Sequence, residues 1–406
     1  MVPGGRRIRV ALVGTRGVPA RYGGFETCVE EVGRRLAERG HRVVVYCRDA
    51  GDAEKADAYQ GMELVHRGAM HRRSLETLSH TGSSVAHLML HRTDAAVVFN
   101  AANAVYLPAL RAARIPVATH VDGLEWKRAK WGRGGHAYYR VAESLAVRWS
   151  DALIADAPGI ADYYRDEFAA DTELIAYGAP IVSTDSSRLG ELGLEPGGYH
   201  LVVARFEPEN HVAMIVEGYA RSAAALPLVV VGSAPYADEY GRRIRAAADD
   251  RVRFLGGVWD QEQLDQLYAG ARSYLHGHSV GGTNPSLLRA LGAGIAVIAY
   301  DVSFNRDVAR TAAGYFSDAA GVSAELARIE ADPDLVTRRA GAARARAAVY
   351  DWEVVADSYE SLCLRLADHE LVRSSRPFFA QRTGAAGRRR AEQHAGPAGA
   401  PEEVAR

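Results

Sequence analysis

The first segment with chemical potential, residues 14–26, reads Gly-Thr-Arg-Gly-Val-Pro-Ala-Arg-Tyr-Gly-Gly-Phe-Glu. Glycine lets backbone N–H groups approach a ligand closely, and the start of a helix favours an anion. Because Arg16 and Arg21 add positive charge, the segment predicts a phosphate-binding loop. The Gly-x-Gly-x-x-Gly spacing of dinucleotide-binding proteins is absent, although Asp49 lies near the position where such proteins have an acidic residue. The alternative is a tight turn that needs glycine only for packing.

A second glycine-rich segment, residues 276–286, reads His-Gly-His-Ser-Val-Gly-Gly-Thr-Asn-Pro-Ser. Thr283 or Asn284 suits a helix N-cap and Pro285 suits the first helical position, so we expect a helix to begin here. The free N–H groups at its start would bind a diphosphate. His276 and His278 would share a strand face, so a metal pair is conceivable. Without a third ligand nearby, hydrogen bonding is the favoured role.

Two further segments follow predicted strands. Arg205, in Arg-Phe-Glu-Pro-Glu-Asn-His, would place a guanidinium at the carboxyl end of a strand, where it could clamp a diphosphate. A surface salt bridge is equally compatible with that spacing. Residues 120–128 read His-Val-Asp-Gly-Leu-Glu-Trp-Lys-Arg. Acids, bases and an aromatic ring clustered in this way suit binding of a polyhydroxylated molecule.

The apolar pattern predicts the scaffold that must bring these segments together. Short apolar runs alternate with helical patterns in two successive series, which indicates two α/β domains with parallel sheets. The predicted strands are residues 8–14, 42–47, 95–99, 116–120 and 152–155, then 199–206, 228–232, 251–255, 273–276 and 295–300. Ligands of such sheets bind at the carboxyl ends of the strands, so we expect two facing, doubly wound, Rossmann-like domains with a cleft between them.

The chain divides into four predicted parts. Residues 1–182 and 183–350 form the two domains, and residues 351–372 form a helix that returns across the gap. Residues 373–406 contain almost no large apolar side chains and are predicted to be a disordered tail.

Composition excludes several classes of protein. The chain has 49 Lys and Arg and 50 Asp and Glu. This balance does not favour nucleic-acid binding, which is typical of basic proteins. Cys28, Cys47 and Cys363 lie far apart without the spacing of a disulfide framework or zinc site, so we expect a reducing compartment. No apolar run approaches the ~20 residues of a membrane span, and no signal peptide precedes the first strand. We therefore expect a cytoplasmic protein, with peripheral contact with the inner membrane surface left open.

Together the motifs resemble the GT-B glycosyltransferases, specifically the rhamnosyltransferase-like subgroup of the retaining family 4, which serves bacterial polysaccharide assembly. The resemblance covers roughly residues 8–365. It rests on Thr-Arg-Gly-Val-Pro-Ala-Arg-Tyr-Gly-Gly-Phe-Glu-Thr, Val-Asp-Gly-Leu-Glu-Trp-Lys-Arg, Ile-Ala-Asp, Ile-Ala-Tyr-Gly-Ala, Pro-Glu-Asn-His and His-Ser-Val-Gly-Gly-Thr-Asn-Pro-Ser-Leu-Leu. It implies a nucleotide-diphosphate sugar held mainly by the second domain and a glycan or lipid-linked glycan acceptor held mainly by the first.

The resemblance also implies roles for individual residues. The donor would be bound by Gly23, Gly24, Arg205, Asn210, His278, Gly282, Thr283, Asn284, Ser286 and Arg289. The sugar-facing catalytic residue would be His120 or Asp122. The acceptor would be bound by Arg16, Arg21, Glu125, Trp126 and Lys127. Asn210 stands where the broader family often has lysine.

One departure from the family pattern bears on activity. The broader family carries a glutamate, seven residues and a second glutamate across the second glycine-rich segment, and the second glutamate usually binds the nucleotide ribose. Gly281 and Arg289 stand at these positions. An arginine cannot accept hydrogen bonds from a diol. It could pair with a phosphate or with a nearby acid, so donor binding is either rearranged or weakened.

The resemblance thus implies a transferase for rhamnose or another hexose that retains the anomeric configuration. It would need no metal and no cofactor, because helix N-termini and arginine would neutralise the leaving diphosphate. Two alternatives remain. One is a non-catalytic sugar-nucleotide-binding or scaffold protein, motivated by Arg289, and the other is a sugar-nucleotide epimerase of the same architecture.

Overall fold

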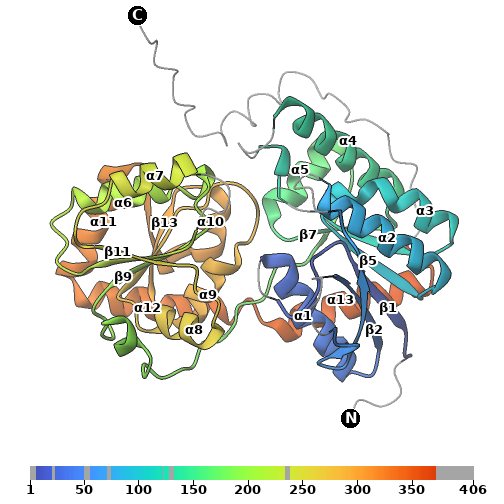
Figure 1. The fold of residues 1–406 in the computed structure, drawn as a ribbon, viewed down its shortest axis with the longest axis horizontal. Coiled ribbons are helices and arrows are strands. Elements are labelled where there is room, and N and C mark those ends of the chain that lie inside the picture. The colour runs from blue at the N-terminus through green and yellow to red at the C-terminus, as the bar shows by residue number, and fades with distance from the viewer. Residues whose placement is uncertain are drawn as a thin grey trace, which may run out of the picture.

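The computed structural model describes residues 6–20, 23–49, 55–70, 75–121, 123–127, 132–233 and 238–371. They form two α/β units, each built around one sheet (Figure 1). We call the unit with the eight-stranded sheet the N-terminal unit and the unit with the six-stranded sheet the C-terminal unit.

The N-terminal unit alternates strands and helices. Its strands are β1 (Arg9–Val13), β2 (Arg42–Arg48), β3 (Ala58–Tyr59), β4 (Met62–Arg67), β5 (Ala95–Phe99), β6 (Val117–His120), β7 (Ala152–Ala155) and β8 (Glu173–Leu174). Its helices are α1 (Gly24–Glu38), α2 (Glu76–Leu90), η1 (Ala101–Tyr106), α3 (Leu107–Ala112), η2 (Glu125–Lys127), α4 (Arg133–Trp149) and α5 (Pro158–Phe168). The strand order is β3-β4-β2-β1-β5-β6-β7-β8, and β3 pairs with β4 antiparallel while the other pairs are parallel.

The C-terminal unit has a wholly parallel sheet in the order β11-β10-β9-β12-β13-β14. Its strands are β9 (His200–Val203), β10 (Leu228–Val231), β11 (Val252–Gly256), β12 (Ser273–His276), β13 (Ala296–Tyr300) and β14 (Ala313–Phe316). Its helices are η3 (Leu189–Leu192), η4 (Pro208–Asn210), α6 (Val212–Ala220), α7 (Asp238–Ala246), α8 (Gln261–Ala269), α9 (Pro285–Ala293), α10 (Ser303–Ala309), η5 (Arg310–Ala312), α11 (Ala319–Ala331) and α12 (Pro333–Ala347).

The central strands form because their apolar runs can be buried on both faces by helices. Every residue of β5 and of β10 is buried. Helix α1 buries Val29, Val32 and Leu36 against the first sheet. Among the strands that the structure describes, β3, β4, β8 and β14 have no counterpart in the prediction.

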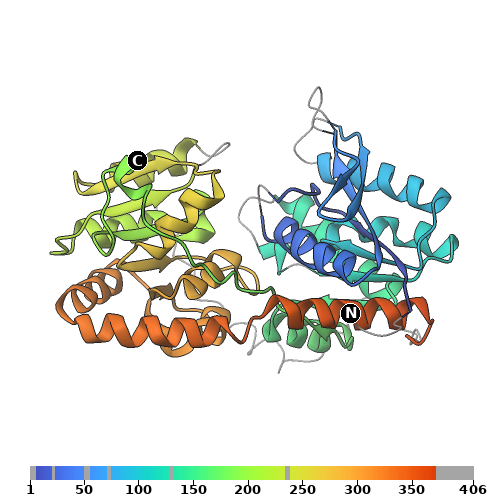
Figure 2. The ribbon, with the colours of Figure 1, turned by 90° about the horizontal axis from the view of Figure 1, so that it is seen from below.

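The last described helix, α13 (Trp352–Ala367), crosses back to the N-terminal unit and lies along α1 (Figure 2). Its buried side chains include Trp352, Val355, Tyr359, Leu362 and Leu366, at the helical spacing seen in the sequence. One cluster of buried apolar side chains contains residues of both units and of α13. The two units therefore share part of their core.

The carboxyl ends of the two sheets face each other, because residues that follow β7 contact the loop between β12 and α9. This is the facing arrangement that the two series of strands predict. Within the described ranges, no helix is both long enough and apolar enough to cross a membrane.

Candidate functional site

The first glycine-rich segment connects β1 with α1. Two of its glycines serve packing, since Gly14 (φ 102°) abuts the Phe99 carbonyl and Gly17 (φ 95°) abuts Cys47. Gly23 is the N-cap of α1, so no side chain occupies the N–H groups from the cap position. The packing alternative therefore holds for Gly14 and Gly17, whereas the position beside Gly23 is taken by the Glu26 carboxylate, since a Cβ at Gly23 would lie 2.6 Å from Glu26 Oε2.

Glu26 ties this segment to the first turn of α1. Its Oε1 accepts a hydrogen bond from the Arg16 N–H at 3.0 Å, while the Arg16 residue is exposed. Burial raises the pKa of Glu26, and hydrogen bonds from the Arg16 N–H and from the Glu26 N–H in the first turn of α1 oppose that shift, as do the charges of Arg16 and Arg48. Glu26 thus fixes the backbone of the loop and leaves the Arg16 side chain at the surface.

The second glycine-rich segment leads from β12 into α9. Asn284 is the N-cap, because its Oδ1 accepts from the Ser286 N–H at 2.9 Å, and Pro285 is in the first turn. The Ser286 hydroxyl donates to Asn284 Oδ1 at 2.7 Å and accepts from the Tyr274 hydroxyl at 2.9 Å. This chain of hydrogen bonds anchors the start of α9 to the buried end of β12.

The starts of α1 and α9 meet between the two units. A Cβ atom at Gly24 would lie 2.9 Å from Pro285 Cγ, so a side chain there would push the two helices apart. Helix N-termini carry partial positive charge and N–H groups without intrahelical partners. Two such ends side by side suit a ligand with more than one negative charge, such as a diphosphate.

Asp156, which follows β7, links the N-terminal unit to the loop that precedes α9. Its Oδ2 accepts from the Thr283 N–H at 3.1 Å, and its carbonyl accepts from the Thr283 hydroxyl at 2.6 Å. Burial raises the pKa of Asp156 to about 7, and hydrogen bonds from its own backbone and from Thr283 oppose the shift. Thr283 therefore joins the two units, and Asn284 alone caps α9.

His120, at the end of β6, is enclosed by aromatic rings. The ring centroids of Phe25, Phe99 and Tyr177 lie 5.1, 5.5 and 5.7 Å from that of His120. Burial lowers the pKa of His120 to about 3, with hydrogen bonding to the Val121 backbone in opposition. His120 is therefore neutral near pH 7 and can orient a hydroxyl group without supplying a positive charge.

His278 is oriented by Asn210. Asn210 Nδ2 donates to the Arg205 carbonyl at 2.8 Å, which turns its Oδ1 toward His278 Nδ1 at 2.7 Å. Because an amide oxygen only accepts, His278 Nδ1 donates in this contact, and Nε2 lies beside Gly281. His276 is instead bonded to the Tyr274 hydroxyl at 3.2 Å, and burial lowers its pKa to about 3.

The two arginines predicted to bind the donor have different surroundings. Arg205 Nη1 lies 3.7 Å from Glu207 Oε1, and 41% of the Arg205 side chain is exposed. Arg289 pairs with Asp265 of α8, and these side chains are 19% and 26% exposed. Of the two partners expected for Arg289, a phosphate or a nearby acid, the structure shows the acid.

The residues predicted to bind the acceptor are described only in part, because Arg21 and the side chain of Lys127 lie outside the described residues. Asp122, the alternative to His120 as the catalytic residue, also lies outside them. Glu125 is buried, and the Trp126 ring lies 5.2 Å from the guanidinium carbon of Arg140 on α4. Within the described part of the chain, no group of three or more His, Cys, Asp or Glu could hold a metal ion.

Residues 192–346 match the family model described as glycosyl transferases group 1. These residues make up most of the C-terminal unit. Residues 114–180 match a second model, described as a domain of unknown function, DUF1972. His120 and Asp156 lie in the region that matches DUF1972, whereas Asn210, His278 and the start of α9 lie in the region that matches the glycosyl transferase model.

Solved structures share the fold of the whole described chain. Sucrose-phosphate synthase from Thermosynechococcus elongatus is 20% identical, with a TM-score of 0.77 over 90% of this chain and 100% of that one. HepE from Anabaena, in complex with UDP-glucose, is 16% identical, with a TM-score of 0.71 over 88% of this chain and 99% of that one. These similarities confirm the predicted GT-B fold.

A curated relative matches a shorter segment. The GtfA subunit of UDP-N-acetylglucosamine--peptide N-acetylglucosaminyltransferase from Streptococcus gordonii is 32% identical over 111 residues. These residues are 26% of this chain and 21% of the relative, so the match spans about a fifth of the relative's length.

Sequence reasoning gave no role to several residues that the structure brings to the site. Asp156 and Tyr177 lie within motifs that carried the family resemblance, Ile-Ala-Asp and Ile-Ala-Tyr-Gly-Ala, so their signal was present. Phe25 lies inside the first glycine-rich segment and contacts the His120 ring. Asp265 had no signal, because only the packing of α8 against α9 brings it to Arg289.

Proposed function

We propose that the protein is a glycosyltransferase that moves a hexose, with rhamnose as one candidate, from a nucleotide diphosphate to an acceptor. The acceptor would be a glycan or lipid-linked glycan of bacterial polysaccharide assembly. The observation that carries the proposal is the meeting of the α1 and α9 starts, in a chain whose residues 192–346 match the glycosyl transferases group 1 model. The UDP-glucose complex of the similarly folded HepE supports a nucleotide-sugar donor.

The fixed positive ends of the two helices would stabilise the leaving group. As the bond between sugar and diphosphate breaks, negative charge builds on the phosphate oxygens. N–H groups at both helix starts would stabilise this charge. Arg205, partly exposed at the carboxyl end of β9, would add a mobile positive charge. In this proposal no metal and no further cofactor is required. Attack of the acceptor on the face that the diphosphate leaves would retain the anomeric configuration.

The sugar itself would meet two histidine rings. His278 would present Nε2 beside Gly281, and His120 would present its ring within an aromatic wall. Polar atoms in fixed positions beside apolar walls give a site specificity for a polar ligand. The acceptor glycan would approach along Arg16, Glu125 and Trp126 of the N-terminal unit.

A transfer assay tests this proposal directly. Purified protein is incubated with a series of nucleotide sugars and a lipid-linked glycan, and we expect transfer from one donor. The Gly24→Ala variant should reduce kcat/KM at least about tenfold, because its methyl group would separate the helix starts by pressing on Pro285. Gly341→Ala on α12, where a Cβ meets no atom within 4 Å, is the matched control. Absence of both transfer and donor hydrolysis with every donor would end the catalytic claim.

The pairing of Arg289 with Asp265 favours a second candidate, a protein that binds a nucleotide sugar without turning it over. Arg289→Glu alone would bring two carboxylates together, so the informative variant combines it with Asp265→Asn. A large gain in transfer by the double variant would show that Arg289 limits catalysis. Tight nucleotide binding by both proteins, measured as a rise in melting temperature, without any turnover would support the binding protein.

We place this reaction in the cytoplasm. Cys28, Cys47 and Cys363 are buried free thiols, which fits a reducing compartment. Separating a cell lysate into soluble, membrane and periplasmic fractions and detecting the protein in each tests this placement, and recovery from the periplasm would contradict it.

A further inference from the structure

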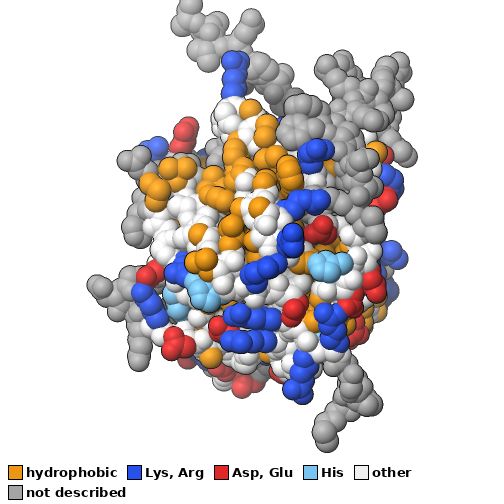
Figure 3. Space-filling view, turned by 90° about the vertical axis from the view of Figure 1, so that its right-hand side faces the viewer, with side chains coloured by type: hydrophobic (Ala, Val, Ile, Leu, Met, Phe, Trp, Pro, Cys, Tyr) orange, Lys and Arg blue, Asp and Glu red, His pale blue; other side chains and the backbone are white. Residues whose placement is uncertain are grey.

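One face of the N-terminal unit exposes apolar side chains. Leu90 at the end of α2 is 81% exposed, Val141 on α4 is 49% exposed, and Met89 and Val105 are 37% and 36% exposed. Apolar side chains gather on the side of the molecule shown in Figure 3, with Lys and Arg side chains along their border. We define the α2–α4 face as the following residues of α2, η1, α3 and α4 and of the segments directly after them: Met89, Leu90, Arg92, Val105, Arg111, Arg114, Val141, Arg148 and Trp149.

Contacts between the ends of the helices join the arginines of this face and Trp149. The guanidinium carbons of Arg111 on α3 and Arg148 on α4 lie 6.0 and 5.8 Å from the Trp149 ring. Arg92, which follows α2, donates to the Arg114 carbonyl at 3.1 Å. The end of α2 is thereby held beside the end of α3, and α3 beside the end of α4.

The α2–α4 face is positively charged in a chain whose net charge is −1. The face contains four arginines, Arg92, Arg111, Arg114 and Arg148. Of the acids between Arg92 and Arg148 that the structure describes, Glu125 and Glu143 are buried and Asp94 accepts a hydrogen bond from the Arg9 N–H. The described part of this face therefore presents arginine and apolar side chains with little opposing charge.

We propose that the α2–α4 face docks the protein on an anionic lipid bilayer. Leu90 and Val141 would enter the boundary between headgroups and acyl chains, as apolar side chains of interfacial helices do. Trp149, between two arginines, has the amphipathic ring that favours this boundary. Arg92, Arg111 and Arg114 would contact the acidic headgroups. A nucleic acid would satisfy the arginines but not the exposed leucine and valine.

This inference goes beyond the proposed function. The ends of α2, α3 and α4 lead into the amino ends of β5, β6 and β7, whereas the candidate site lies at the carboxyl ends of the strands. Docking through this face would therefore leave the candidate site turned away from the bilayer.

The test is sedimentation of the full chain with vesicles that contain neither donor nor acceptor. Vesicles of phosphatidylcholine mixed with phosphatidylglycerol should bind the protein, and phosphatidylcholine vesicles should bind it much less. Arg111→Glu with Arg114→Glu should weaken binding at least about tenfold, because each lost arginine removes an attraction to the surface. Leu90→Ser with Val141→Ser should also weaken binding, because these changes remove apolar side chains that would enter the boundary.

The matched control is Arg242→Glu with Arg243→Glu, which makes the same charge change at exposed positions of α7 in the C-terminal unit. Equal loss of binding in this control would show that only net charge matters and would overturn the proposal, as would no binding to either vesicle. Tighter binding to a polynucleotide than to anionic vesicles, lost in the same variants, would assign the face to nucleic acid. Because the vesicles hold no substrate, failure of sugar transfer leaves this result unaffected.

Discussion

Asp156 joins the two units through a carboxyl group that burial makes hard to ionise. It contributes both an acceptor oxygen and a backbone carbonyl to Thr283, at the loop that precedes α9. A negative charge at this position would stand close to the proposed diphosphate. The raised pKa of Asp156 reduces that conflict, because a large share of the molecules carry the neutral form near pH 7.

The pH dependence of the protein's stability should reveal the raised pKa of Asp156. An aspartate ionises near pH 4 when unfolded and near pH 7 here, so between these values the folded state keeps a proton that the unfolded state has lost. Stability therefore falls as pH rises through that interval. We expect the melting temperature of the wild type to fall, relative to Asp156→Asn, by about 4 °C from pH 5 to pH 8. Parallel melting curves for the two proteins across this range would contradict the assignment.

Residues that satisfy local backbone requirements could be predicted from the sequence. Glycine at positions 23 and 24, the cap at Asn284 and Pro285 could be predicted because they reflect local backbone requirements. The contact of Asp156 with Thr283 could not be predicted, because it joins residues 127 positions apart through the packing of two sheets. The same holds for the aromatic enclosure of His120.

At the scale of elements, central strands were predictable because their burial on both faces leaves an unbroken apolar run. Strand β4 escaped prediction since its buried and partly exposed residues alternate at only its first positions, and β3 and β8 have two residues each. Strand β14 contains a glycine in four residues. These strands lie at or beside sheet edges, where fewer neighbours constrain the sequence.

The loop before α9 can be tested by adding one methyl group. A Cβ atom at Gly282 would lie 2.3 Å from Asp156 Oδ1, so Gly282→Ala should break the contact between the units. We expect a loss of about 1–3 kcal/mol in the free energy of unfolding, as for overpacking of a buried site. Gly159→Ala on α5, where a Cβ meets no atom within 4 Å, should cost nothing measurable in the same denaturant titration. Equal stability of the two variants would disprove the close contact.

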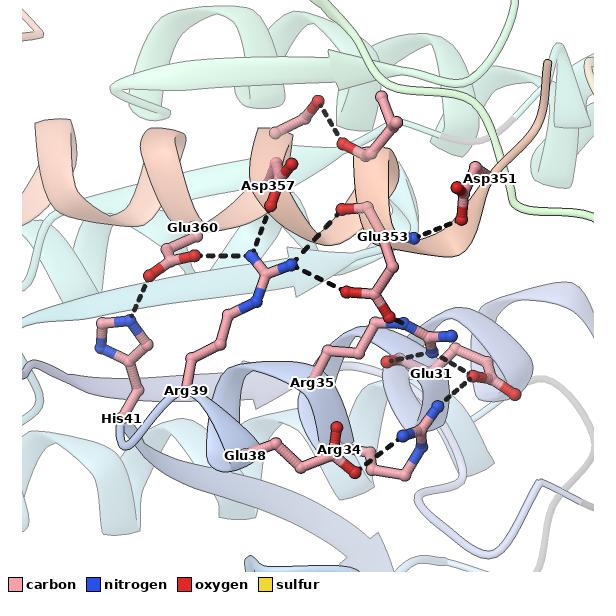
Figure 4. A network of polar contacts seen from close by, with 12 residues as sticks. Glu31, Arg34, Arg35, Glu38, Arg39, His41, Asp351, Glu353, Asp357 and Glu360 are labelled. Carbon is pink, nitrogen blue, oxygen red and sulfur yellow. Dashed lines mark hydrogen bonds and ion pairs between the residues drawn. The ribbon is translucent and has the colours of Figure 1, made fainter. Parts of the chain in front are cut away.

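Helix α13 is held to α1 by two kinds of contact. Arg39 lies among Glu353, Asp357 and Glu360 of α13, with Nη1 2.6 Å from Glu360 Oε2 (Figure 4). Hydrogen bonds from Arg35 and Arg39 lower the pKa of Glu353. At the start of the helix, Trp352 is 6% exposed and belongs to the shared apolar core.

The apolar contact should dominate. Trp352→Ala should reduce the free energy of unfolding by about 3–5 kcal/mol, whereas Arg39→Ala should cost about 1 kcal/mol because ion pairs near the surface are screened. Denaturant titrations at low and high salt separate the two, since only the difference between wild type and Arg39→Ala should shrink with salt. A larger loss for Arg39→Ala than for Trp352→Ala would reverse this ranking.

At the scale of the whole molecule, the chain passes between the two units twice. It leaves the N-terminal unit after β8 and returns before α13, and the two passages lie together because the Ala179 N–H donates to the Tyr350 carbonyl at 2.7 Å. The facing sheets were predictable from two series of strands. The adjacency of the two passages was not, because it depends on where α12 ends relative to β8.

The hydrogen bond between Ala179 and Tyr350 has a practical consequence. It makes the C-terminal unit an insertion whose entry and exit are a single paired crossing, with both flanking segments belonging to the same host. Units inserted in this way can be exchanged when their ends are close. Residues 180–349 could therefore be replaced by the corresponding unit of another protein of the same fold, and the chimera would keep α13 and its contacts with α1.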